Sequence, residues 1–406
     1  MSEIVEIAKL GHAGDGVAQD GLFVPYTVPG DIARVGRDGT RGALDEIITK
    51  GAWRTEPPCR HFTRCGGCAL QHVAREPYLA WKRDLVVDAL KQRGFAHVLV
   101  EDIRAVGPGT RRRASFKAQK TKRFVELGFY APRTQTLIDV QDCPILVPSL
   151  FAVIAPLRKA LNGILTISEK PELHTTLTDT GIDLTIRQKR PRKLDWLIDL
   201  AAMAHGLKLA RLCWNDEVIA MNIRPTHRIG TFTVALPPES FLQPTAEGER
   251  ILQNLVREEI GDAKRIADLF SGCGTFALTL APDMATVHAV DNSAPQTSAL
   301  VVAARMGGAK VTSETRDLFR RPLLPAQLSR FDAVILDPPR PGALEQARAL
   351  AQSGISRVLY VSCNPASFAR DARILSDGGF HLSRVVPLDQ FVWSPHVELF
   401  AVFTRP

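Results

Sequence analysis

The last part of the chain, residues 235–406, alternates short apolar runs with stretches of helix-forming residues. Four of these runs lie at 265–270, 287–291, 331–336 and 357–362. This alternation predicts a parallel sheet covered by helices on both faces, the α/β class. Ligands of such sheets bind at the carboxyl ends of the strands, so the residues that directly follow each run are the candidate functional residues.

The first two runs end in residues that suit a nucleotide-like ligand. The run 265–270 is followed by Ser-Gly-Cys-Gly-Thr, in which Gly272 and Gly274 let the backbone turn sharply and approach a ligand. The next run ends at Asp291, whose carboxylate can bond ribose hydroxyls. Gly-x-Gly-x-x-Ala also fits the dinucleotide fingerprint, so a nicotinamide cofactor stays open here, although no hydride-transfer site is visible downstream.

The third run leads into Asp337-Pro338-Pro339-Arg340. The two prolines end the strand and stiffen a loop that can hold a flat base beside the cofactor. Methyltransferases that act on amino groups have a similar Asp-Pro-Pro-Tyr loop, so Arg340 and the next motif must discriminate between them. Asp317, at the end of an intervening strand-like stretch, is placed to reach an adenine.

The fourth run delivers Cys363, in Ser-Cys-Asn-Pro, to the same sheet edge. A cysteine can be a buried structural thiol, but a strand-end position favours a nucleophile. One reaction that needs such a nucleophile is the methylation of uracil at C5, because a thiolate that adds to C6 makes C5 able to accept a methyl group. The proton on C5 must then be removed, and Glu398 is the candidate base, with His396 second. The alternative for Glu398 is a surface or ion-paired carboxylate.

Residues 1–52 predict a small β-barrel, because short alternating strands are separated by Gly-rich and Pro-Gly turns at 11–16 and 29–31. The expected core residues are Ile4, Val5, Ile7, Val17, Leu22, Val24 and Val35. The patterns Gly-His-Ala-Gly-Asp-Gly-Val-Ala and Phe-Val-Pro-Tyr-Thr-Val-Pro-Gly-Asp resemble a TRAM domain, an OB-like RNA-binding barrel. A barrel used only for packing is the alternative.

Residues 53–234 predict a mixed central segment, with a helix over 77–94 followed by short strands. The chain carries a net charge of +8, and much of it falls in two clusters of this segment. Such clusters favour phosphate binding, although a charged run is often only a solvated face. The first cluster is Arg111, Arg112, Arg113, Lys117, Lys120, Lys122 and Arg123, with Phe116 and Phe124 interleaved, and the second is Arg187, Lys189, Arg190, Arg192 and Lys193.

Four cysteines predict a metal site. Cys59, Cys65 and Cys68 are bunched, and Cys143 precedes a proline further along the chain. In a reducing compartment such bunching indicates metal rather than disulfides. Zinc and iron-sulfur clusters both take four cysteines, and the spacing separates them poorly.

Four motifs together resemble the RNA 5-methyluridine methyltransferase family, which modifies tRNA and 23S rRNA. They are Asp-Leu-Phe-Ser-Gly-Cys-Gly-Thr-Phe at 268–276, Asp-Pro-Pro-Arg-Pro-Gly at 337–342, Val-Ser-Cys-Asn-Pro at 361–365 and His-Val-Glu at 396–398. Phe-Leu-Gln-Pro at 241–244 is similar to a further family motif, so the resemblance spans essentially the whole chain.

The resemblance implies a Rossmann-like class I methyltransferase domain at 235–406 that uses S-adenosylmethionine. It implies Cys363 as nucleophile and Glu398 as base. Thr275 stands where many members have asparagine, and Asp291 where many have glutamate, and both residues keep their hydrogen-bonding ability. The resemblance implies Gln243, Phe270, Asp291 and Asp337 as cofactor residues, and with the strand-end residues the predicted set is Gln243, Phe270, Gly272, Gly274, Thr275, Asp291, Asp317 and Asp337.

The 23S rRNA branch of the family carries the same cysteine arrangement. That resemblance implies a 4Fe-4S cluster on Cys59, Cys65, Cys68 and Cys143 in an α+β central domain at 53–234, with zinc as the alternative. A radical S-adenosylmethionine enzyme would show Cys-x3-Cys-x2-Cys, from which Cys59-x5-Cys65 departs. The substrate implied is 23S rRNA, with tRNA as the first alternative and a non-catalytic RNA-binding or assembly factor as the second.

The sequence predicts a cytoplasmic protein. Residues 1–10 lack the basic end and apolar block of a secretory signal, and no apolar stretch approaches the length of a membrane span. We expect a monomer that binds RNA and no membrane.

Overall fold

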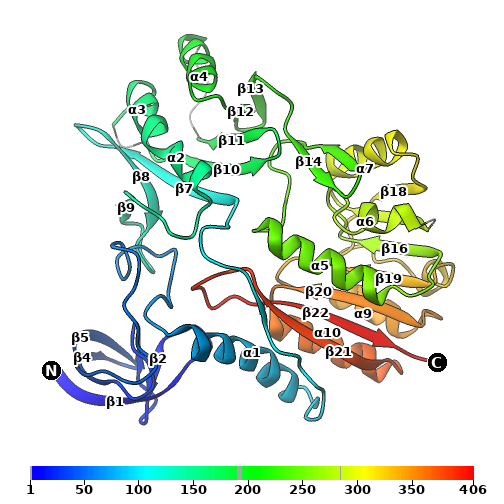
Figure 1. Ribbon diagram of the computed structural model, residues 1–406, viewed down its shortest axis with the longest axis horizontal. Coiled ribbons are helices and arrows are strands. Elements are labelled where there is room, and N and C mark those ends of the chain that lie inside the picture. Colours follow the sequence, from blue (N-terminus) through cyan, green and yellow to red (C-terminus); the bar gives the residue numbers. More distant parts are fainter. Residues whose placement is uncertain (1, 168, 190–193, 284) are drawn as a thin grey trace.

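The computed structural model describes residues 2–167, 169–189, 194–283 and 285–406. Arg190, Arg192 and Lys193 of the second basic cluster therefore lie outside the described residues. Figure 1 shows a barrel at the N-terminus, a central sheet, and a sheet that carries the C-terminus. A hairpin of β14 (Thr226–Ile229) and β15 (Phe232–Ala235) leads from the central sheet into the C-terminal one.

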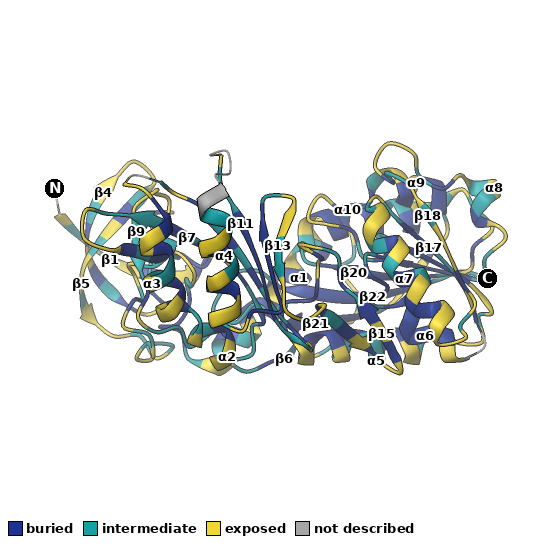
Figure 2. Cartoon of the chain, turned by 90° about the horizontal axis from the view of Figure 1, so that it is seen from above, coloured by how far each residue is buried: buried dark blue, intermediate teal, exposed yellow. Residues whose placement is uncertain are grey.

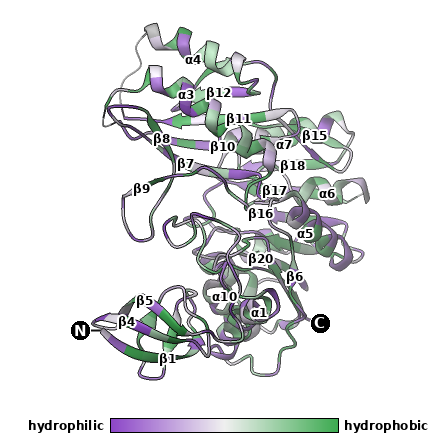
Figure 3. Cartoon of the chain, turned by 60° about the vertical axis from the view of Figure 1, so that its left-hand side comes forward, coloured by the Kyte–Doolittle hydropathy of each residue, from purple (hydrophilic) through white to green (hydrophobic). Residues whose placement is uncertain are grey.

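The N-terminal barrel is closed, with strand order β1-β2-β3-β5-β4, which confirms the predicted barrel. Polar and apolar stretches follow one another along its strands (Figure 3), as expected where only one face of a strand meets a core. Ile7, Leu22 and Val35 are buried as predicted, but Ile4 is 58% exposed, because it points to the outer face of β1. The strands are β1 (Ser2–Leu10), β2 (Gly16–Ala18), β3 (Phe23–Val24), β4 (Ile32–Asp38) and β5 (Arg41–Thr49).

The central sheet has seven strands in the order β13-β12-β11-β10-β7-β8-β9. Three helices, α2 (Pro148–Ala152), α3 (Ile154–Ile164) and α4 (Leu194–Gly206), contribute to its apolar core. Phe116 is fully buried in that core, so of the two aromatics in the first basic cluster only Phe124 is exposed. The strands are β7 (Arg113–Lys120), β8 (Val125–Tyr130), β9 (Leu137–Asp139), β10 (Glu172–Thr178), β11 (Gly181–Arg187), β12 (Arg211–Trp214) and β13 (Glu217–Met221).

The C-terminal sheet has eight strands in the order β18-β17-β16-β19-β20-β22-β21-β6. Strands β16 to β20 are parallel, with helices over both faces, as predicted (Figure 2), and all of them except the edge strand β18 are largely buried. β22 is antiparallel to both β20 and β21. The strands are β6 (Arg104–Ala105), β16 (Arg265–Leu269), β17 (Thr286–Asp291), β18 (Val311–Thr315), β19 (Ala333–Leu336), β20 (Arg357–Ser362), β21 (His381–Asp389) and β22 (Glu398–Thr404).

Two apolar cores lie on opposite faces of this sheet. One includes side chains of α5 (Ala246–Glu259), α6 (Ala277–Leu280) and α7 (Ala294–Met306), and a short 3-10 turn, Ala281–Asp283, directly follows α6. The other includes α8 (Pro325–Leu328), α9 (Leu344–Ala351) and α10 (Pro365–Asp377). No helix of the described residues is long and apolar enough to cross a bilayer.

Helix α1 (Arg75–Lys91), which corresponds to the helix expected over 77–94, packs on the C-terminal sheet although it precedes the central sheet in the chain. Its Lys82 is fully buried and pairs with Asp389 at the end of β21. The Tyr78 hydroxyl donates to the same carboxylate at 2.7 Å. Burial lowers the pKa of Lys82 to about 8, and the Asp389 charge opposes that fall. The contacts of Lys82 and Tyr78 with Asp389 therefore fix the end of β21 to a helix that comes from an earlier part of the chain.

Replacing Asp389 should destabilise the protein strongly, because it leaves the Lys82 charge buried without a partner. We predict that Asp389→Ala lowers the free energy of unfolding by about 3–5 kcal/mol in urea titrations. Asp377→Ala is the matched control, since it removes an exposed partner of Arg373 and should change stability by less than about 1 kcal/mol. Equal losses in the two variants would contradict this role of the buried pair.

Candidate functional site

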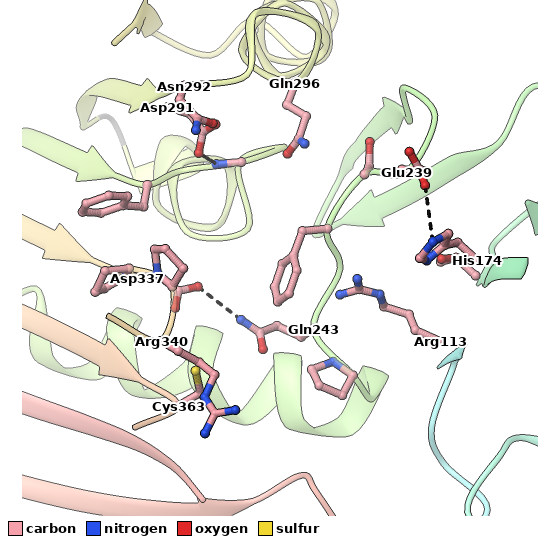
Figure 4. Close-up of a pocket in the computed structure, with 18 of the residues that line it drawn as sticks. Arg113, His174, Glu239, Gln243, Asp291, Asn292, Gln296, Asp337, Arg340 and Cys363 are labelled. Atoms are coloured by element: carbon pink, nitrogen blue, oxygen red, sulfur yellow. Dashed lines mark hydrogen bonds and ion pairs between the residues drawn. The ribbon is translucent and has the colours of Figure 1, made fainter. Parts of the chain in front are cut away.

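A cavity of about 720 Å³ lies between the carboxyl ends of the parallel C-terminal strands and strands β7 and β10 of the central sheet. Figure 4 shows side chains from both sheets converging on it. The cavity is lined by nine residues that the sequence predicts for cofactor binding, as nucleophile or as base, namely Gln243, Phe270, Gly272, Asp291, Asp317, Asp337, Cys363, His396 and Glu398. The fold therefore brings together residues that are far apart in the chain, at the strand ends where the sequence predicts a site.

The loop after β16 forms one wall of this cavity. Phe270 adopts a left-handed backbone with φ of 63°, and Gly272 follows with φ of 52°. A left-handed conformation is uncommon for a side-chain-bearing residue and is found where a site demands it. The ring of Phe270 packs at 5.5 Å, centroid to centroid, against that of Phe319, which gives the cavity an aromatic side.

Three carboxylates at successive strand ends face the cavity. Asp291 ends β17 and accepts hydrogen bonds from the amides of Gly272 at 3.0 Å and Ser293 at 2.8 Å. Asp317 follows β18 and accepts from the Phe319 amide at 3.0 Å. Asp337 follows β19 and accepts from Gln243 Nε2 at 3.2 Å, while burial raises its pKa to about 7. An aromatic wall with carboxylates at strand ends suits an adenosine-containing ligand.

Two of the predicted cofactor residues do not line the cavity. Gly274 has φ of 94°, and a Cβ there would stand 2.6 Å from Leu300 Cδ1, so this glycine permits close packing of α7. The carbonyl of Thr275 accepts hydrogen bonds from Thr279 and Gln253, within and beside α6. The contacts of both residues shape the loop that carries Gly272.

Cys363 and Glu398 are brought together by the pairing of β20 with β22. Ser362 lies opposite Leu399 in that antiparallel ladder, so the next pair in register is Cys363 with Glu398. Glu398 is buried at 4% exposure, whereas Cys363 is half-buried. The two side chains predicted as nucleophile and base therefore sit side by side at the edge of the sheet.

The loop that bears Cys363 is tied to the loop that bears Arg340. Asn364 caps α10 by accepting from the Ala366 amide at 3.1 Å. Its Nδ2 and the Ser367 hydroxyl both donate to the Arg340 carbonyl, at 3.1 and 2.9 Å. Figure 4 shows the Arg340 side chain beside Cys363. A guanidinium next to a cysteine at a helix start favours the thiolate.

Burial dominates the acid-base properties of this pair. It raises the pKa of Cys363 to about 12, with Glu398 and Asp337 adding to the rise and Arg340 opposing it. Burial, followed by the charge of Asp337, also raises the pKa of Glu398 well above its usual range. Cys363 is therefore protonated in the free protein at neutral pH, burial favours the protonated form of Glu398, and a cation entering the cavity would lower both pKa values.

Several residues that line the cavity were not predicted as site residues. Arg111, Arg113 and His174 come from the central sheet and its approach, and the Arg113 guanidinium lies 4.4 Å from the ring centroid of Phe241. The first basic cluster named the two arginines, but only the fold shows that they face the cavity. Arg112, between them, points away and forms a buried ion pair with Glu249.

Cys59, Cys65, Cys68 and Cys143 line a second cavity of about 600 Å³. It shares Arg111, Phe391 and His396 with the first cavity, so the two are neighbours. Among the described residues, no three potential ligands lie close enough to hold a single metal ion. A zinc ion and a four-iron cluster both take four cysteine ligands, so the cysteine lining of this cavity does not separate the two.

Comparison with known proteins gives a family match. The model of a family described as tRNA (uracil-5-)-methyltransferase matches residues 174–405. An uncharacterized RNA methyltransferase of Brucella suis biovar 1 is 44% identical over 99% of this chain and 97% of its own length. The 23S rRNA (uracil(1939)-C(5))-methyltransferase RlmD of Halomonas elongata is 32% identical over 98% of this chain and 89% of its own length.

A solved structure shares the whole fold. The tRNA (uracil-54, C5)-methyltransferase of Pyrococcus abyssi, in complex with S-adenosyl-L-homocysteine, superposes with a TM-score of 0.77. The superposition covers 99% of both chains at 23% identity. At that identity the likeness concerns the fold, which is therefore the same across all three parts of the chain.

The raised pKa of Cys363 predicts a poorly reactive thiol in the free protein. At pH 7.5 the thiolate fraction of a group with a pKa of about 12 is far below that of an unperturbed cysteine. We predict that iodoacetamide modifies Cys363 in the folded protein more than about tenfold more slowly than in urea. Peptide mass spectrometry measures both rates, and similar rates in the two states would contradict the predicted shift.

Proposed function

The chain belongs to the RNA uracil-5-methyltransferase family, and on that premise we propose that it methylates C5 of a uridine in 23S rRNA, with Cys363 as nucleophile and Glu398 as base. The observation that carries the proposal is the pairing of β20 with β22, which sets these two side chains together in the cavity. As an RNA uracil-5-methyltransferase, the protein uses S-adenosylmethionine as methyl donor.

The cofactor half of the cavity has the side chains that this donor needs. Asp291 would bind the ribose hydroxyls, and Phe270 with Phe319 would enclose the adenine, with Asp317 beside it. Gln243 and Asp337 would lie at the other end, toward Cys363. When bound, S-adenosylmethionine supplies the methyl group and a positive sulfonium charge.

The first chemical task of the chain is to activate the uracil ring. The half-buried Cys363 thiol gives its proton to water, and the thiolate then forms a bond to C6 of uracil while the electron pair of the C5–C6 double bond shifts toward C5 and the O4 oxygen. Arg340 beside Cys363 stabilises the negative charge on sulfur before the bond forms. C5 becomes nucleophilic enough to accept the methyl group.

The second task is to release the product. Glu398 removes the proton that remains on C5, the C5–C6 double bond re-forms, and the bond from C6 to Cys363 breaks. The positive charge of a bound methyl donor would favour the ionised Glu398 carboxylate, and methyl transfer would remove that charge. Burial then raises the proton affinity of the Glu398 carboxylate. The base is thus strongest after methyl transfer, when it is needed.

The RNA would enter from the side of the central sheet. Arg111 and Arg113 are the cationic residues of that segment that line the cavity, and they are placed to contact the phosphates that flank the target uridine. The closed barrel of residues 2–49 would contribute a second RNA contact as a TRAM-type module. Full-length identity with a relative named for 23S rRNA supports that substrate over tRNA.

We assign the four-cysteine cavity to a 4Fe-4S cluster that shapes the central domain. The four thiols line one cavity, and a 4Fe-4S cluster takes four cysteine ligands. Because this cavity shares Arg111 and His396 with the methylation site, the cluster would hold the RNA-facing wall in place.

Removing the nucleophile should abolish methylation without loss of RNA binding. Cys363→Ala should transfer no labelled methyl from S-adenosylmethionine to 23S rRNA, while filter binding of the RNA stays within about twofold, because the phosphate contacts dominate affinity. Cys213→Ala, which changes a buried thiol of the central sheet, is the control and should stay active. Undiminished methyl transfer by Cys363→Ala would overturn the mechanism. If the unsubstituted protein methylates tRNA and not 23S rRNA, the substrate is tRNA.

Removing the base should trap the covalent intermediate. Glu398→Gln keeps the shape but cannot take the C5 proton, so turnover should fall by about 10²- to 10⁴-fold while a slow-migrating protein–RNA species appears on denaturing gels. The doubly substituted Cys363→Ala/Glu398→Gln protein should show no such species. A Glu398→Gln protein that turns over normally would exclude Glu398 as the base.

Metal analysis tests the cluster. Protein purified without oxygen should be brown and contain about four irons per chain, as a Cys₄-held cluster requires. Cys68→Ala should lose the iron and Cys213→Ala should keep it. Stoichiometric zinc in place of iron would refute the assignment.

A further inference from the structure

Gln390 is a buried amide that the mechanism does not yet use. It directly follows β21, between the two strands that end at the site, and is 1% exposed. Its Nε2 donates two hydrogen bonds, to Glu398 Oε2 and to Gln243 Oε1, each at 2.9 Å. Both amide hydrogens are therefore directed at residues of the catalytic cavity.

These contacts form a continuous hydrogen-bonded chain. Glu398 is joined to Gln390, Gln390 to Gln243, and Gln243 Nε2 to Asp337 Oδ2 at 3.2 Å. The chain runs from the proposed base to two residues of the proposed cofactor site. Since the oxygen of Gln243 accepts from Gln390, its NH₂ group is turned toward Asp337.

The position of Gln390 is fixed from both sides. The preceding residue, Asp389, is held by Lys82 and Tyr78 of α1 and accepts the Phe391 amide at 3.1 Å. On the opposite side, a Cβ on Gly248 would stand 2.5 Å from Gln390 Oε1, so the first turn of α5 packs directly on this amide. A side chain held this tightly can fix the position of the carboxylate that it contacts.

The donor group matches what Glu398 needs as a base. A carboxylate only accepts hydrogen bonds, and a donor that contacts one oxygen favours the ionised form. Asp337 and Cys363 also face Glu398, while Arg340 and His396 line the same cavity. Gln390 is the hydrogen-bond donor to the Glu398 carboxylate among the described side chains, and it opposes the effect of burial on the pKa of that group.

We propose that Gln390 is a positioning residue that holds the Glu398 carboxylate, ionised and oriented for removal of the C5 proton, and links its position to the cofactor site through Gln243. This inference rests on the proposed role of Glu398. It predicts that loss of Gln390 slows proton removal much more than methyl transfer, because Gln390 does not contact Cys363.

Two labels separate these steps. RNA carrying tritium at C5 of uridine is combined with S-adenosylmethionine carrying a ¹⁴C methyl group, in a single turnover with the cofactor saturating. Methyl incorporation reports transfer, and release of tritium to water reports proton removal. In Gln390→Leu, methyl incorporation should change by less than about threefold, whereas tritium release should slow by roughly 10- to 100-fold, the worth of a hydrogen bond to a charged group.

Covalent protein–RNA adduct should accumulate in Gln390→Leu while tritium release lags. Gln346→Leu is the matched control, because Gln346 is also 1% exposed and makes two hydrogen bonds to the Leu323 backbone, outside the cavity. It should leave the ratio of the two rates unchanged. If Gln390→Leu folds poorly, the test is repeated with Gln390→Met, whose side chain is close to glutamine in length but lacks the amide donor.

The outcomes distinguish this inference from the proposed function. Parallel slowing of both labels in Gln390→Leu and Gln390→Met, or no change in either, overturns the positioning role. If tritium release is undiminished in Glu398→Gln, the base assignment itself fails, whatever Gln390 does. If tritium release is slow in Glu398→Gln but normal in both Gln390 variants, the assignment of Glu398 as base stands and the positioning role of Gln390 is rejected.

Discussion

The antiparallel pairing of β22 between β20 and β21 is the constraint on which the site depends. The parallel strands alone bring Asp291, Asp337 and Cys363 to one sheet edge, because their carboxyl ends meet there. β22 runs the other way, so its first residue, Glu398, which we propose as the base, lies at that same edge. The reversed strand thus adds a carboxylate to the edge where the parallel strands end.

Burial and charge act together at this edge. Glu398, Asp337 and Cys363 would all be poorly placed as ions in the free protein, since burial raises the pKa of each. A cationic cofactor would lower the free-energy cost of burying these charges, and loss of the positive charge after methyl transfer would restore that cost. Burial therefore favours the neutral form of these three residues in the empty cavity, and a bound cation would favour their ionised forms.

The sequence predicts the parallel sheet and most of its functional side chains, because apolar runs and strand-end polar residues are local signals. It does not show that helix α1 packs on the C-terminal sheet, since the Lys82–Asp389 pair joins residues at opposite ends of the chain. Nor does it separate Arg112, buried against Glu249, from Arg111 and Arg113 in the cavity. Gly274 and Thr275 belong to the predicted motif yet serve the loop, a distinction that depends on the packing of Leu300.

The most direct test of the account uses RNA in which the target uridine is replaced by 5-fluorouridine. Fluorine at C5 cannot be removed as a proton, so the reaction should stop after methyl transfer with the RNA still bound to the protein. Digestion and tandem mass spectrometry of the unmodified enzyme should place a methylated fluorouridine on the peptide that contains Cys363. A modified nucleotide on another residue, or methylated product without a covalent adduct, would contradict the mechanism.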